Sequence, residues 1–139
     1  MAFLTETDYS VQVRNEVKII IAQQPGSQEM AELMAEAEIT GYLRPRGYDV
    51  AAIFAATAAA RNPLIIMYMI DIVLYHLYSN IATRAIPATR ETRYNAAINW
   101  LEKVSKGQIE PQLPYLENDT DDATPAIKLG SNIKYAKRY

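Results

Sequence analysis

The sequence of 139 residues contains no cysteine and only one histidine, His76. The absence of cysteine excludes disulfides, thiolate zinc sites and cysteine nucleophiles. One imidazole is too few for an ordinary transition-metal site, which uses several imidazoles or a cluster of carboxylates. We therefore expect no metal ion and no cofactor, and we expect His76 to make a structural hydrogen bond.

Glycine is scarce, and its five residues stand one by one along the chain. They form neither a glycine-rich phosphate loop nor a Gly-x-Ser-x-Gly nucleophile turn. The carboxylates Glu36 and Glu38 would point to different sides of a helix, so a solvated face is expected there rather than a general acid and base. These absences predict that the protein is not an enzyme.

Long hydrophobic runs are also lacking. The most apolar stretch, 64–78, is shorter than the roughly 20 residues that a bilayer span needs, and it contains Asp71 and His76. The N-terminus has no pattern of a secretory signal, so we expect cytosolic synthesis and no membrane partner. The net charge of -2 argues against an overall basic surface that grips phosphate backbones.

Apolar residues at helical spacing, bounded by start and stop signals, are what the chain does contain. They predict helices over residues 5–22, 27–44, 50–60, 63–79 and 87–106. The segment 63–79 is apolar nearly all round, which is typical of a helix surrounded by others. The predicted fold class is all-α, a small bundle of four main helices around this central apolar helix.

Short polar signals mark the helix ends. Four residues are expected to cap helix starts: Thr5, Ser27, Asp49 and Asn62. Asp8 completes a capping box with Thr5, and Leu4 and Tyr9 are placed for a hydrophobic staple. Pro63 follows Asn62 at the first helical position, where its missing N–H is not needed. Arg44-Pro45 and Gly107 are stop signals.

The second predicted helix has a wide apolar face made of two adjoining stripes. One stripe consists of Met30, Leu33, Met34 and Ala37, and the other of Ala35, Ile39, Tyr42 and Leu43. Three tyrosines of the central helix, Tyr68, Tyr75 and Tyr78, form a ridge that belongs either to the core or to a subunit interface. The core is the favoured alternative. Charged residues of the last helix, such as Arg93, are expected on a solvated face.

The character of the chain changes after Gly107. Residues 1–107 are predicted to form a helical domain, and residues 108–139, with several prolines and no helical period, an extended C-terminal arm. The arm's candidate partner-binding residues are apolar anchors and an aromatic, basic end: Tyr115, Leu116, Ile127, Leu129, Tyr135, Lys137, Arg138 and Tyr139. Leu74→Ala in the central helix is expected to cost about 2 to 5 kcal/mol. Leu113→Ala in the arm is expected to change stability little.

Four stretches carry a resemblance to a known family: FLTETDY at 3–9, EAEITGYLRPRGYDV at 36–50, RNPLIIMYMIDIVLYHLY at 61–78 and RYNAAINWLEKVSKG at 93–107. They resemble the head-to-tail connector proteins of tailed bacteriophages, of the type found in Mu-like phages and Bacteroidetes prophages. The resemblance covers Phe3 to Gly107. It implies a small helical subunit of a homo-oligomeric ring, commonly twelvefold, that binds the portal protein and joins the head to tail or neck proteins.

The resemblance further implies a place in the virion at the head–tail junction, with assembly in the host cytoplasm. DNA would pass through the lumen of the ring without specific binding, and an acidic chain suits such transit. Two other hypotheses remain open. The basic end, with Lys134, Lys137 and Arg138 and the rings of Tyr135 and Tyr139, fits a small nucleic-acid-binding protein. An enzyme would need a pocket lined by Asp71, His76 and a tyrosine.

Overall fold

The apolar segment after Asn62 forms the central helix, α5 (Pro63–Ser79), in the computed structural model, which describes residues 3–13, 15–22, 26–80 and 86–117. The Asn62 side chain accepts hydrogen bonds from the backbone N–H groups of Leu64 (2.9 Å) and Ile65 (3.3 Å). Leu74 and other apolar side chains of α5 are fully buried. The predicted start, end and central position of this helix are confirmed.

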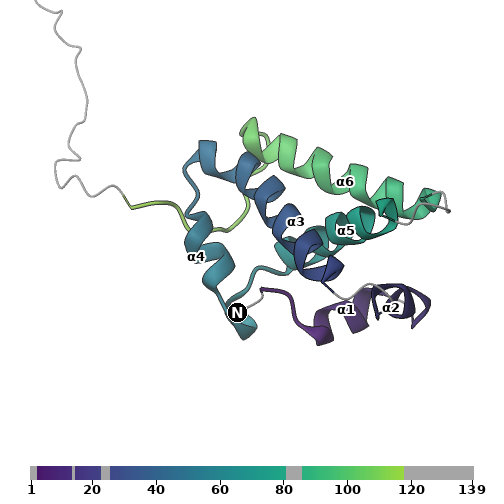
Figure 1. Cartoon of the computed structure of the whole chain (residues 1–139). Coiled ribbons are helices and arrows are strands. Elements are labelled where there is room, and N and C mark those ends of the chain that lie inside the picture. Colours follow the sequence, from purple (N-terminus) through teal and green to yellow (C-terminus); the bar gives the residue numbers. More distant parts are fainter. Residues whose placement is uncertain (1–2, 14, 23–25, 81–85, 118–139) are drawn as a thin grey trace, which may run out of the picture.

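Two long helices cover α5, namely α3 (Ser27–Leu43) and α6 (Ala88–Ser105) (Figure 1). They also contact each other, so the three helices share one core. Helix α6 ends before Gly107, whose φ of 76° is the left-handed conformation expected of a glycine at a helix end. The described residues contain no strand, and the predicted all-α fold is confirmed. None of their helices is long and apolar enough to cross a membrane.

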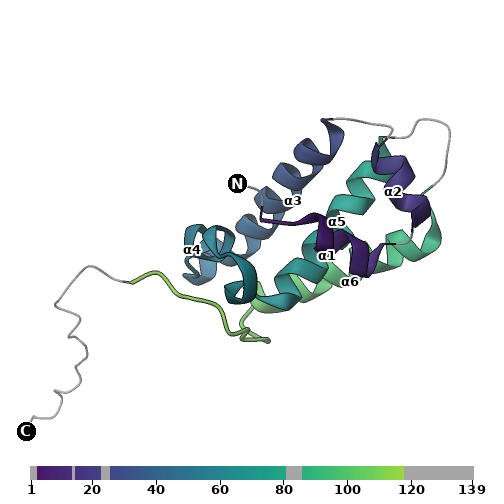
Figure 2. The ribbon, with the colours of Figure 1, turned by 90° about the horizontal axis from the view of Figure 1, so that it is seen from below.

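The first predicted helix is two helices, α1 (Glu6–Gln12) and α2 (Asn15–Ala22). The capping box of Thr5 and Asp8 is confirmed. Val13 then adopts extended backbone angles, and its side chain is buried in the core. A β-branched residue tolerates this geometry well, and apolar periodicity alone does not reveal a break of so few residues. In Figure 2, α1 crosses α5, which it contacts.

Two further boundaries differ from the prediction. Gly26, with φ of 86°, stands at the N-cap of α3, so Ser27 is the first helical residue rather than the cap. The predicted helix 50–60 is a short helix, α4 (Val50–Ala55), followed by a separate 3₁₀ turn, η2 (Ala58–Ala60). Alanine has the highest helix propensity, but propensity is a weak guide to helix length, and Ala56 and Thr57 adopt extended backbone angles here. Asp49 caps α4 as predicted, accepting a hydrogen bond from the N–H of Ala52 at 3.0 Å.

Residues 108–117 lie against the helical domain. Backbone N–H groups of Asp49 and Leu116 donate to the carbonyls of Pro114 and Gly47, both at 2.8 Å. Leu113 is only 8% exposed and belongs to the hydrophobic core. The expectation that Leu113 contributes little to stability is therefore wrong, because an extended segment can place one side chain in a gap that helical periodicity does not show. The division of the chain at Gly107 itself stays a prediction.

Candidate partner-binding surface

Tyr115, one of the predicted partner-binding residues, holds the arm's first residues on the domain. Its ring stacks on that of Tyr48, with centroids 4.5 Å apart and an angle of 18° between the planes. Its hydroxyl lies 3.2 Å from the Tyr48 hydroxyl and 3.1 Å from Glu110 Oε1. The hydrogen bond with Tyr48, together with some burial and the bond with Glu110, raises the pKa of Tyr115 to about 12. Tyr115 thus has an intramolecular role, while half of its surface remains exposed.

Leu116, the next predicted anchor, is 52% exposed. It lies at a recess of about 320 Å³ between the end of α3 and the start of α4, which Glu36 and Ala51 also line. The arm therefore leaves the described part of the chain beside the outer side of α3. The remaining predicted anchors lie outside the described residues: Ile127, Leu129, Tyr135, Lys137, Arg138 and Tyr139.

A larger groove of about 530 Å³ adjoins this recess, since Glu36 and Ala51 line both. It runs between α3 and α4 toward the N-terminal segment, and its apolar side chains include Phe3, Leu33 and Phe54. One wall carries three carboxylates on successive turns of α3: Glu29, Glu32 and Glu36. No basic side chain lines it among the described residues. The groove, which we call the α3–α4 groove, is apolar inside and acidic along one edge.

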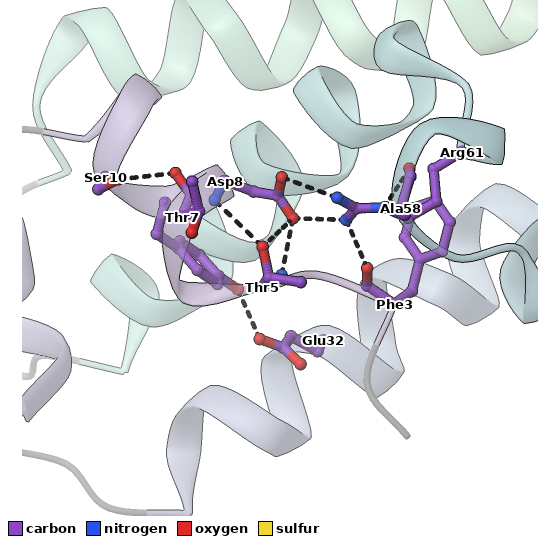
Figure 3. A network of polar contacts seen from close by, with 9 residues as sticks. Phe3, Thr5, Thr7, Asp8, Ser10, Glu32, Ala58 and Arg61 are labelled. Carbon is purple, nitrogen blue, oxygen red and sulfur yellow. Dashed lines mark hydrogen bonds and ion pairs between the residues drawn. The ribbon is translucent and has the colours of Figure 1, made fainter.

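Phe3, at one end of the α3–α4 groove, is fixed by a polar network (Figure 3). The Arg61 guanidinium donates to both carboxylate oxygens of Asp8 and, at 2.8 Å, to the carbonyl of Phe3. It also lies 5.7 Å from the centre of the Phe3 ring, which in turn meets the Phe54 ring edge-on at 5.2 Å. Although burial opposes ionisation, the hydrogen bonds from Arg61 and Thr5 lower the pKa of Asp8 below 3.8. The end wall of the groove is thus pre-organised.

Helix α3 presents an apolar stripe beside the groove. The second predicted stripe supplies the buried residues Ala35, Ile39 and Leu43, and Ala31, which belongs to neither predicted stripe, is buried beside them. The other stripe is exposed in the single chain, with 58% of Met30, 60% of Leu33 and 43% of Met34 accessible. Exposed apolar side chains that adjoin one another are typical of an interaction surface. Together, the groove and this stripe form the candidate partner-binding surface.

The residues of the hypothetical enzyme site do not form one cluster. His76 Nε2 forms a hydrogen bond with Glu38 Oε1, and the Tyr94 hydroxyl donates to Glu38 Oε2 at 3.0 Å. Asp71 is instead bound by Arg93 Nε at 2.7 Å. Glu38 and Arg93 were expected on solvated faces, and each in fact pairs with a polar side chain on a neighbouring helix, although 42% of the Arg93 side chain stays exposed. Sequence reasoning missed both pairs, since their members are far apart in the chain.

Tyr94 belongs to a polar and aromatic cluster with Glu38 and His76. Burial, and then the hydrogen bond with Glu38, raises the pKa of Tyr94 to about 12, so the phenol remains protonated. The Tyr75 and Tyr94 rings stack at 3.9 Å, and Tyr68 lies 4.9 Å from Trp100. Tyr68 and Tyr78 are partly buried against the core, which agrees with the favoured core alternative for these two residues of the tyrosine ridge. Among the described residues, no group of three histidine or acidic side chains could hold a metal ion.

A comparison with models of protein families assigns the chain to a family. The family model described as Bacteriophage Mu, Gp36 matches residues 5–128, which is most of the sequence. The chain belongs to the Mu Gp36 family. It is therefore a bacteriophage protein, and a structural or morphogenetic role is supported. The Mu Gp36 match extends beyond Gly107 into the arm. Comparisons with curated proteins and with solved structures found no match.

Proposed function

We propose that this Mu Gp36 family member is a structural subunit of the connector between the phage head and tail, that it acts in the virion and that it is not an enzyme. Family membership is the observation that carries the proposal, because it assigns the chain to a phage and covers both the helical domain and much of the arm. The resemblance of the helical segments to head-to-tail connector proteins supplies the specific role. Its partners would be further copies of itself, the portal protein and tail or neck proteins.

The surface of the described domain supports an assembly role. The exposed stripe of Met30, Leu33 and Met34 lies beside a groove on the same helix. Adjoining exposed apolar side chains are typical of a surface that a partner covers, and in a ring every subunit would present the same patch to a neighbour. The likeness to connectors implies a ring that is commonly twelvefold, and we adopt that number for the proposal.

The arm supports the same proposal. Beyond Glu117 the sequence has acidic and basic clusters, one proline and few apolar residues, so it has little apolar surface with which to pack on itself. Fixing such a segment costs roughly 1 to 2 kcal/mol per residue, which contacts with a partner must offset. We propose that the arm extends over a neighbouring subunit or the portal and is anchored by its apolar residues and its aromatic, basic end.

The direct experiment is inactivation of the gene in the phage or prophage that encodes this chain. Loss of a connector should leave DNA-filled heads and free tails that do not join, visible by electron microscopy, and infectivity should return when the chain is supplied in trans. Glu102→Gln, a change on the exposed side of α6, should restore joining fully and serves as the matched control. Normal infectious particles without the gene would refute the proposal, as would a block at head formation.

A further inference from the structure

The α3–α4 groove has the chemistry of a receptor for a short basic and aromatic peptide. Its apolar interior accepts rings and aliphatic side chains, while its acidic edge favours cations. In the described part of the chain, Glu29 and Glu36 form no ion pair, and Glu32 only accepts hydrogen bonds from Tyr9 and Gln28. The edge therefore keeps its negative charge available for an external partner.

The chain contains one segment that matches this chemistry, at its C-terminal end. Residues 133–139, IKYAKRY, contain three cationic side chains, Lys134, Lys137 and Arg138, interleaved with Ile133, Tyr135 and Tyr139. The carboxylates of the groove follow one another at three- and four-residue steps of α3, so they offer a row of charges about one helix turn apart. Positive charges between apolar side chains on a short peptide complement that row.

The reach of the arm suffices for exchange between subunits. The described chain ends at Glu117, beside the recess that adjoins the groove. Residues 118–132 separate this point from the basic segment and, at about 3.3 Å per residue, span up to roughly 50 Å. A domain of this size has a radius of gyration of only about 13 Å, so the segment can reach an adjacent copy.

We propose that the α3–α4 groove receives residues 133–139 of a neighbouring copy of this chain. The inference rests on the proposed ring, and it names the surface that each arm occupies. Each subunit then provides one groove and one arm, a heterologous contact that closes around a ring. The rings of Tyr135 and Tyr139 enter among Phe54, Leu33 and Phe3, and the three cations face the acidic edge.

Disulfide trapping provides the test, because the chain has no cysteine of its own. One full-length chain carries Ala51→Cys in the groove, and a second carries Ala136→Cys in the basic segment. The two chains are mixed as purified proteins in one experiment and co-assembled in phage particles in another. Both samples are then oxidised mildly. We expect a crosslinked dimer that contains one chain of each kind. Ala96→Cys, on the exposed side of α6, is the control for the groove position and should crosslink far more slowly.

Charge variants test the specificity of the contact. Replacing Lys134, Lys137 and Arg138 by Glu should slow trapping about tenfold, since each exposed pair contributes a factor of a little over about twofold and the three factors multiply. Introducing Glu29→Lys and Glu36→Lys in the chain that carries Ala51→Cys should restore the rate of trapping. A charge change that merely damaged folding would not be rescued in this way.

The outcomes separate the inference from the proposed function. Trapping no faster than at Ala96, in particles that contain the chain at the head–tail junction, would overturn the groove assignment and leave the connector role intact. A third chain carries both Ala51→Cys and Ala136→Cys, and a crosslink that forms only within this chain would also overturn exchange between copies, as would a crosslink only to the portal protein. Trapping between purified chains, combined with normal particles in the absence of the gene, would uphold the groove contact and reject the connector role.

Discussion

Leu113 provides the sharpest test of how the arm begins. The residue lies beyond the last helix, yet its side chain is 8% exposed and packs in the core. Leu-to-Ala changes at buried sites cost about 2 to 5 kcal/mol, and a site at the edge of the core that can partly collapse should fall in the lower part of this range. We therefore expect Leu113→Ala to reduce the free energy of unfolding by about 2 to 3 kcal/mol.

For a domain of this size a loss of 1 kcal/mol lowers the melting temperature by roughly 4 °C, so Leu113→Ala should melt about 10 °C below the parent protein. Urea unfolding followed by circular dichroism measures the same change as a lower midpoint with an unchanged slope. Leu116→Ala is the matched control, because Leu116 lies in the same segment but is 52% exposed. The Leu116→Ala substitution should change the free energy of unfolding by no more than about 0.5 kcal/mol. Equal effects of the two substitutions would refute the packing of residues 108–117 on the domain.

Three further predictions follow from the polar contacts and the arm. Asp8→Asn should lower the free energy of unfolding at neutral pH. The difference in stability between the two proteins should shrink as the pH falls below 3.8, because a carboxylate whose pKa is lowered in the folded state stops stabilising that state once it is protonated. Urea midpoints of both proteins at pH 7 and pH 3 measure this difference. His76→Gln should cost about 1 to 3 kcal/mol of stability through the lost bond to Glu38, and metal analysis of the parent protein should find no stoichiometric transition metal. Deleting residues 118–139 should leave the helical circular dichroism and melting of the domain nearly unchanged while abolishing head–tail joining in the complementation assay. An unfolded truncated chain, or one that still forms infectious particles, would contradict the proposed role of the arm.

The sequence by itself determined the features that depend on neighbours in the chain. Three helices start where the sequence predicts, because capping hydrogen bonds form within three residues. The capping residues are Thr5, which forms a capping box with Asp8, then Asp49, and Asn62, which precedes Pro63. The nearly uniform apolarity of α5 likewise predicts its central position, since no orientation of such a helix can expose one face without cost.

Only the tertiary structure decided which apolar residues are buried and which polar residues meet. Helix α3 has two apolar stripes, and the one that contains Ala35, Ile39 and Leu43 is buried in the core while Met30, Leu33 and Met34 stay exposed. Small residues allow helix backbones to approach closely, but the choice depends on the shape of α5 and α6. In the same way, Glu38 finds His76 and Leu113 finds the core across long stretches of sequence, and such contacts arise from the packing of whole helices rather than from local preference.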